Sequence, residues 1–238
     1  MREGHLHDES LIPAQTTSVL DVGCGRGGNA AWLNEKGIKV DAISWSGEDL
    51  QVAKRFCRRV FKCDLNHGLP DIEPETYDGI ICSHVLEHIA YPEQLLTDIE
   101  RALMPRGFLL VIIPNLFFWS DRLKLMLGHW NYDESGTFDY THLRWYTIQS
   151  IQRLLAGYGF VTDRFIADGW IPLPGARLIL GDGLRKRINV MACRLSPGLF
   201  GQQLIFRFRK QRSKEGAQSQ GQRAKSLERG AGPLISDL

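Results

Sequence analysis

The residues with the clearest chemical capacity lie in a glycine-rich stretch that follows a short apolar run. Three glycines fit the pattern G-x-G-x-x-G, namely Gly23, Gly25 and Gly28. Asp21 stands two residues before the first of them. Glycines accept positive φ and let backbone approach a ligand, and a helix beginning there offers unpaired N–H groups and partial positive charge. A fixed carboxylate would repel a pyrophosphate but suits an ammonium group, so the stretch predicts a nucleotide-like ligand bearing an ammonium. A tight turn without a ligand is the alternative.

The segment Val19–Gly27 resembles motif I of the class I S-adenosylmethionine-dependent methyltransferases, V-L-D-V-G-C-G-x-G. S-adenosylmethionine carries an ammonium and a carboxylate on its methionine end, which matches the acid and the glycine turn. The resemblance therefore implies this cofactor and an enzyme that transfers its methyl group. It also implies that Asp21, Gly23 and Gly25 hold the methionine portion.

The same resemblance assigns residues that follow the next strands. Asp64, after the third strand, is implied to contact the adenine, with Leu65 supplying backbone. The alternative for Asp64 is a turn-forming role. Ser83 and His84 follow the fourth strand and are implied to lie on the sulfonium side of the cofactor.

Ser44 departs from the family pattern at the end of the second strand. The family usually has an acid there that accepts hydrogen bonds from both ribose hydroxyls. A serine makes one uncharged, weaker bond, and Glu48 or Asp49 in the next helix would compensate unless both are simply solvated. A nicotinamide dehydrogenase is another interpretation of the glycine pattern. It is disfavoured by Asp21 and by the missing acid at Ser44, which NAD needs for its 2′-hydroxyl.

A second block, rich in aromatic residues, surrounds the pattern Asp139-x-x-His142-x-Arg144. Aromatic faces with a few polar groups suit a sugar or another polyol. His142 is the first candidate for a general base because histidine titrates near neutrality, and His84 is the second. The alternative is that His142 and Arg144 pin the loop through Asp139.

This block resembles bacterial methyltransferases that accompany O-antigen and other surface-glycan genes. The likeness is strongest over 111–160 and, with the approach to the last strand, covers about 18–210. It implies O-methylation of a glycan or a related polar small molecule. A catalytically weak regulatory partner of the MetW type is the runner-up, because the block around 115–127 is similar to those proteins.

The run His84-Val85-Leu86-Glu87-His88 fits H-x-x-E-H, a zinc pattern. A true site of that kind needs a long helix and a further acidic ligand. Here the run follows a buried strand and Pro92 comes soon after, so no metal is predicted. The resemblance implies instead that His84 faces the cofactor pocket while Glu87 and His88 orient the loop.

The elements that must position these residues alternate along the chain. Apolar runs predict strands at 18–22, 38–43, 59–63, 77–82, 108–113, 160–167 and 203–209. Helical patterns lie at 27–36, 48–57, 91–103, 115–128 and 147–156. This alternation predicts an α/β, Rossmann-like, doubly wound fold with a mostly parallel sheet. The resemblance implies seven strands in the order 3-2-1-4-5-7-6 with one antiparallel strand.

The domain organisation follows from the same pattern. An extension (1–17) precedes one methyltransferase-like domain (18–210), which includes an acceptor-side segment (114–147) and an insertion (168–202). A basic tail (211–238), rich in Gln, Ser and Gly, is predicted to be disordered. An apolar stripe in the acceptor-side segment is predicted to pack into the core rather than face lipid; it comprises Phe117, Phe118, Leu123, Leu127 and Trp130.

Charge and composition limit the partners. The 238 residues carry a net charge of +2, but eight basic against two acidic residues give 207–229 a charge of +6, which leaves −4 elsewhere. No nucleic-acid partner is therefore predicted.

The mixed apolar and basic stretch 170–215 is a candidate for peripheral contact with the inner membrane face. The five cysteines lack a C-x-x-C pair and no signal or spanning segment is recognised, so a cytoplasmic location is expected. The oligomeric state is not indicated.

Overall fold

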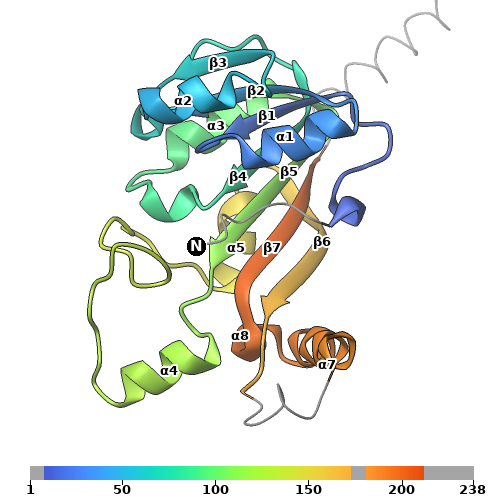
Figure 1. Ribbon diagram of the computed structural model, residues 1–238. Coiled ribbons are helices and arrows are strands. Elements are labelled where there is room, and N and C mark those ends of the chain that lie inside the picture. The colour runs from blue at the N-terminus through green and yellow to red at the C-terminus, as the bar shows by residue number, and fades with distance from the viewer. Residues whose placement is uncertain (1–7, 173–180, 212–238) are drawn as a thin grey trace, which may run out of the picture.

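The computed structural model describes residues 8–172 and 181–211, and these form one seven-stranded sheet flanked by helices (Figure 1). The strands are β1 (Ser18–Val22), β2 (Lys39–Ser44), β3 (Arg59–Lys62), β4 (Tyr77–Ser83), β5 (Leu103–Pro114), β6 (Phe160–Gly169) and β7 (Gly201–Lys210). Their order is β3-β2-β1-β4-β5-β7-β6, which confirms the expected topology.

Strand direction follows the connections. β1 to β5 pair in parallel, because a crossover segment, α-helical except between β3 and β4, carries the chain from the end of one strand to the start of the next. β7 runs antiparallel to both of its neighbours, β5 and β6. The carboxyl ends of the parallel strands therefore meet at one edge of the sheet, where ligands bind in open α/β folds.

The helices cover both faces of the sheet. They are α1 (Gly28–Glu35), α2 (Gly47–Ala53), α3 (Glu93–Ala102), α4 (Trp119–Met126), α5 (Ile148–Ala156), α7 (Asp182–Leu195) and α8 (Pro197–Phe200). Alternate residues of β1 face opposite ways: Val19 packs in the core beneath α1, and Leu20 packs in the core beneath α3 and α5. α5 begins within one residue of the predicted helix 147–156, because Thr147 and Ser150 form a capping box.

The segment before β1 also contributes to the core. A 3-10 helix spans Glu9–Leu11, and the Leu11 side chain is buried beside α1. The predicted tail lies outside the described residues beyond Gln211, and so does part of the insertion, at 173–180.

Three strands are tied together by one buried carboxylate. Asp41 of β2 accepts hydrogen bonds from Arg58 and Arg59, at the start of β3, and from Tyr77 of β4. Burial alone would raise the pKa of Asp41, but these donors outweigh it and lower the pKa to about 2.

Two local predictions are corrected. The helix expected at 115–128 begins only at Trp119, because the Asn115 side chain accepts a hydrogen bond from the Phe117 backbone and forms a turn instead. The sequence Pro105-Arg106-Gly107 favours a turn, but the structure places it within β5, where Arg106 has φ of 68° and the pairing with β4 is irregular.

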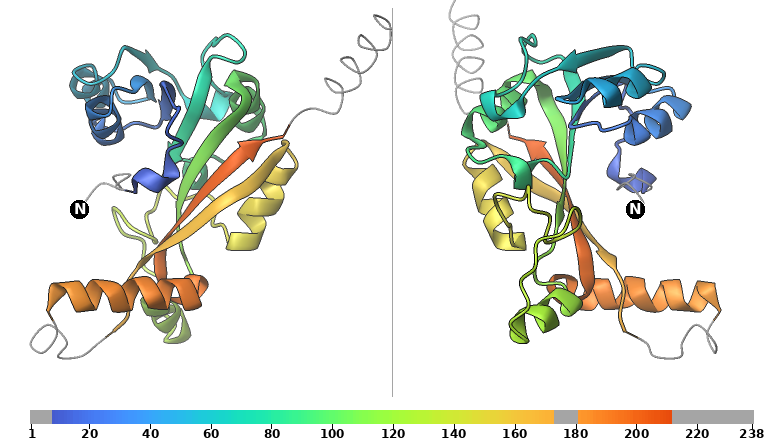
Figure 2. Two further views of the ribbon diagram at one scale, coloured as in Figure 1. Left: turned by 90° about the vertical axis from the view of Figure 1, so that its right-hand side faces the viewer. Right: turned by 60° about the vertical axis from the view of Figure 1, so that its left-hand side comes forward.

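The apolar stripe of the acceptor-side segment is mostly exposed, which corrects the prediction that it packs into the core. Phe118 is buried, but Leu123 is 50% exposed and Leu127 is 64% exposed. α4 follows the long β5 beyond the main helical layers, so no layer covers it. α4 and α7 both lie at the lower end of the molecule, with α8 between them in Figure 1 (Figures 1 and 2). In the described parts of the chain, no helix combines the length and hydropathy needed to cross a bilayer.

Candidate active site

The glycine turn between β1 and α1 is bent close to its neighbours. The N–H groups of Gly23 and Cys24 both donate to the Ile43 carbonyl of β2. Gly23 has φ of 72°, and a Cβ there would lie 2.5 Å from Val85 Cγ2. Gly25 has φ of 49°, and no atom lies within 4 Å of where its Cβ would be. The turn therefore needs glycine for two different reasons: packing on one side and open space for a ligand on the other.

Asp21 is a buried carboxylate beneath this turn. Its side chain is fully buried, and neither oxygen has a hydrogen-bond partner of acceptable geometry. Burial raises its pKa to about 7, although the nearby Asn29 amide offsets part of the rise. A buried acceptor without a firm donor costs free energy, so this site fits a ligand that brings an ammonium donor.

Ser44 and Ser83 end the strands on either side of β1. Strand register places both at the same edge as Gly23. Ser44 is buried, and its hydroxyl accepts a hydrogen bond from the Ser46 N–H at 3.1 Å. Glu48 and Asp49 lie in the first turn of α2, as predicted, with Glu48 exposed.

Asp64 follows β3 and caps a 3-10 helix, Leu65–His67. Its carboxylate accepts hydrogen bonds from the backbone and side chain of Asn66. These bonds lower its pKa. The turn-forming role considered for Asp64 is therefore present. Its carboxylate is exposed, and the second oxygen, Oδ2, lies 3.5 Å from His67 Nδ1.

The loop after β4 carries the first of the acceptor-side groups. His84 has φ of 55°, and its N–H donates to the Ile112 carbonyl of β5. Its Nδ1 lies 3.0 Å from Oε1 of Glu87. The Glu87 carbonyl in turn accepts the N–H groups of Leu143 and Arg144. The two blocks singled out in the sequence are thus joined directly through backbone.

His142 is buried beside this loop. Its Nδ1 lies 3.1 Å from the Thr137 carbonyl, which only accepts, so Nδ1 carries the proton and Nε2 keeps its lone pair. Burial lowers the pKa of His142, against the opposing effect of the Thr137 carbonyl. The ring centroid of His88 lies 4.7 Å away.

The predicted network of Asp139, His142 and Arg144 is arranged differently. The Asp139 carboxylate accepts the N–H and the hydroxyl of Thr141. Arg144 Nε donates to the Ala90 carbonyl at 2.7 Å. Arg144 therefore holds the loop to the segment after β4. Asp139 bonds His142 through backbone only, because its carbonyl accepts the His142 N–H while its carboxylate bonds Thr141.

Aromatic rings line the same block, as the sequence predicted. Trp130 makes edge-on contacts with Phe138 at 5.2 Å and with Trp145 at 5.5 Å, between ring centroids. Trp145 also contacts His142 at 6.5 Å. The aromatic wall and the histidines thus form one surface.

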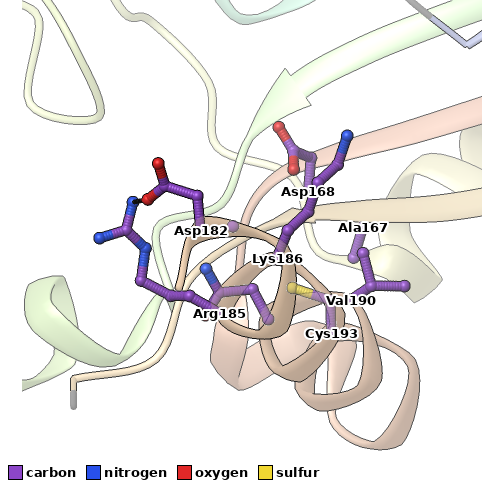
Figure 3. Close-up of a pocket in the computed structure, with 9 residues that line it drawn as sticks. Ala167, Asp168, Asp182, Arg185, Lys186, Val190 and Cys193 are labelled. Atoms are coloured by element: carbon purple, nitrogen blue, oxygen red, sulfur yellow. Dashed lines mark hydrogen bonds and ion pairs between the residues drawn. The ribbon is translucent and has the colours of Figure 1, made fainter. Parts of the chain in front are cut away.

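A separate pocket lies away from all these residues. It has a volume of about 330 Å³ between the end of β6 and α7 (Figure 3). Its lining includes Asp168, Lys186 and the ion pair of Asp182 with Arg185. None of the predicted site residues lines it.

Two of the structurally important residues were not predicted. Asn29, in the first turn of α1, lies near Asp21, and Thr137 fixes the tautomer of His142. The position of Asn29 just after the glycines is a usable signal. The role of Thr137 depends on its backbone carbonyl, which no side-chain pattern reveals.

The chain is similar in sequence to a known protein family and to individual proteins. A family model described as a methyltransferase domain matches residues 5–164. The ubiquinone biosynthesis O-methyltransferase of Idiomarina loihiensis is 31% identical over 94 residues, which is 37% of this chain and 39% of that protein. The enzyme of the same name from Paracidovorax citrulli is 29% identical over 106 residues, or 42% and 44%. The chain therefore matches less than half the length of either relative.

The fold agrees with solved structures. A SAM-dependent methyltransferase from Archaeoglobus fulgidus superposes with a TM-score of 0.58 at 20% identity, covering 83% of this chain and 87% of that one. At this identity the likeness concerns the fold.

Proposed function

The chain belongs to the methyltransferase domain family, and from this premise we propose that it binds S-adenosylmethionine and methylates a hydroxyl group. The observation that carries the proposal is Asp21, a buried carboxylate without a firm partner, set under a glycine turn at the carboxyl edge of the sheet. A pyrophosphate-binding turn would not gain from an acid there. An ammonium-bearing cofactor supplies the missing donor.

We propose that different residues at this edge bind different parts of the cofactor. Asp21, Gly23 and Gly25 would hold the methionine portion, while Ser44 and Asp64 would hold the ribose and the adenine. Leu65 and Ser83 complete the cofactor set. S-adenosylmethionine supplies an electrophilic methyl group on a sulfonium sulfur, so the protein's contribution is mainly alignment.

The acceptor would lie against the aromatic wall, beside the histidines. His142 is the first residue proposed to activate its hydroxyl, because Nε2 keeps its lone pair and burial favours the neutral ring. Arg144 acts through its bond to Ala90, which positions the loop. His84 is the second candidate and is held by Glu87.

The acceptor class is proposed from the same surface. Rings such as Trp130 and Trp145 with few polar groups suit a sugar face, and we retain a glycan or related polar small molecule as acceptor. The two relatives named for ubiquinone biosynthesis align with 37% and 42% of this chain. A phenolic acceptor is therefore the alternative that the experiment must include.

Peripheral membrane contact is proposed at the lower end of the molecule. On α7, the exposed Leu184, Met191 and Leu195 recur at helical spacing on one side. The exposed Arg187 and Arg194 flank them. An apolar stripe beside cations complements an anionic bilayer surface. Within the candidate stretch 170–215, α7 is therefore the part that we propose contacts the membrane.

Calorimetric titration with S-adenosylmethionine, S-adenosylhomocysteine and NADH tests the cofactor. Both sulfur nucleotides should bind the wild type, and Asp21→Ala should weaken them at least tenfold. Failure of the wild type to bind either would overturn the proposal, and binding of NADH alone would indicate a dehydrogenase.

Methyl transfer from labelled cofactor should then be measured with free sugars, lipid-linked glycans and catechols. His142→Ala should lower turnover while cofactor affinity stays nearly unchanged. Tight cofactor binding without transfer to any acceptor would favour a regulatory partner of the MetW type. Exclusive transfer to catechols would replace the glycan in this proposal.

A further inference from the structure

We propose that Glu87, His88 and His142 form a binding site for a divalent transition-metal ion of the Zn²⁺ type. One potential ligand atom from each of the three side chains lies within 4.8 Å of the other two. Two imidazoles and one carboxylate are the ligand set of open, three-ligand zinc sites. The inference deepens the proposed function, on which its catalytic part rests.

The carboxylate is the strongest part of the case. Glu87 is completely buried, and its Oε2 has no hydrogen-bond partner. Its other oxygen, Oε1, faces Nδ1 of His84 at 3.0 Å. One oxygen is therefore oriented by a neighbour while the second is left for a ligand, and buried acceptors are rarely left this way without a reason.

His142 presents the correct nitrogen. Its Nδ1–H donates to the Thr137 carbonyl, so the lone pair of Nε2 remains. Metal-binding histidines usually donate their other N–H to a carbonyl or carboxylate in this manner.

A short chain of hydrogen bonds fixes the tautomer of His88. The Thr141 hydroxyl donates to Asp139 at 2.6 Å, so its proton is not available to His88. The same hydroxyl oxygen lies 2.9 Å from His88 Nδ1, and the Thr141 carbonyl lies 3.3 Å from it. Nδ1 must therefore be the donor, which leaves the Nε2 lone pair for a metal.

The backbone brings the ligands together before any metal binds. The Glu87 carbonyl accepts the N–H groups of Leu143 and Arg144, directly after His142. Ligand atoms bound to one Zn²⁺ lie about 3.4 Å apart, so closure from within 4.8 Å requires only side-chain adjustment.

This site differs from the zinc pattern considered in the sequence. H-x-x-E-H would use His84 and His88 on one long helix, whereas the structure has a 3-10 helix of three residues, Leu86–His88. His84 orients Glu87 instead, and the third ligand comes from the acceptor-side block. The helix argument against a metal therefore does not apply to this cluster, whose third ligand is His142.

The site lies next to the proposed cofactor turn, where a metal ion could activate the acceptor. Val85, two residues before Glu87, packs against Gly23 of the cofactor turn. A cation here would bind the acceptor hydroxyl and lower its pKa. The acceptor hydroxyl would lose its proton to water, and its oxygen would form a bond to the methyl carbon. The bond from that carbon to sulfur would break at the same time, and its electron pair would stay on sulfur. His142 then activates the acceptor as a ligand rather than as a base.

Cobalt binding tests the site without measuring activity. Untagged, full-length protein is dialysed against EDTA and titrated with Co²⁺, and the site is then challenged with Zn²⁺. We expect one equivalent with visible d–d absorption, no sulfur-to-cobalt charge-transfer band, and displacement by Zn²⁺. Charge-transfer bands would place the metal on cysteine and overturn the proposal.

Variants locate the metal. His88→Ala and Glu87→Gln should each weaken Co²⁺ binding at least tenfold, while His129→Ala, at an exposed histidine outside the cluster, should not. Because Glu87 is buried, the half-buried His88 provides the variant least likely to unfold the protein. Thr141→Val should weaken binding about tenfold by releasing His88. Unchanged affinity in both His88→Ala and Glu87→Gln would refute the site.

The two proposals fail separately. If Co²⁺ does not bind but the EDTA-treated protein still methylates an acceptor, only the metal site is wrong. If Co²⁺ binds at these residues and no sulfur nucleotide binds, the metal site stands and the proposed function is wrong.

Discussion

Single residues decide whether the cofactor edge binds its ligand, and Asp21 shows this most directly. Its carboxyl titrates near 3.8 when unfolded and near 7 when folded. The folded state holds the proton more tightly, so this group's stabilising contribution is present below pH 3.8 and is lost as pH rises through about 7. At pH 8 the ligand-free protein therefore carries an ionised, buried and poorly paired group.

Asp21→Asn removes that ionisation. At pH 8 we expect the ligand-free variant to be more stable than the wild type, by up to about 4 kcal/mol, and the difference to shrink towards pH 4. Urea unfolding at both pH values measures it. Asp71→Asn, at an exposed position, is the control. Equal stability of variant and wild type at pH 8 would mean that Asp21 has a partner after all.

Ser44 tests the ribose contact. Ser44→Asp restores the acid that the family usually has, and a charged acceptor forms stronger hydrogen bonds than a hydroxyl. We expect about tenfold tighter S-adenosylmethionine binding by calorimetry. The Ser46 N–H, which now donates to Ser44, remains bonded to the new carboxylate. An unchanged affinity would place the ribose elsewhere.

Among the elements, β2, β3 and β4 depend on Asp41. Its folded pKa is lowered to about 2, so its contribution to stability is present above about pH 3.8 and is lost as pH falls through 2. Asp41→Asn should destabilise the protein at pH 7 by about 1–2 kcal/mol, allowing for solvent screening around the half-exposed arginines. Thermal unfolding measures this. Arg58→Gln should cost less, because Arg59 still pairs with Asp41.

Elements governed by local signals were predictable. β1 matches its predicted bounds, and α5 begins within one residue of its predicted start, because apolar runs and helix caps act over a few residues. The exposure of Leu123 and Leu127 was not predictable, because periodicity shows an apolar face but not whether another layer covers it. The grouping of Glu87 with His142 likewise depends on backbone bonds between distant segments.

The whole molecule has two functional ends in these proposals, a cofactor edge and a lower end formed by α4 and α7. Sedimentation with anionic vesicles tests the second. Replacing Leu184 and Met191 together by Gln should reduce binding about tenfold, since two apolar side chains lose their burial. Val161→Gln removes an equally exposed apolar side chain of β6 and is the control. Equal loss in the control would mean that α7 has no special part.

The position of β7 bears on how the chain is made. This strand follows β5 and β6 in the sequence yet pairs with both of them. Until β7 has been synthesised, β5 therefore lacks its neighbour on that edge, and β6 lacks the strand that joins it to the sheet. Exposed edges recruit other strands, and multi-element chains are vulnerable while such surfaces wait for their partner. We expect the chain to be most prone to wrong strand pairing in this interval, which ends when residues 201–210 pair with both strands.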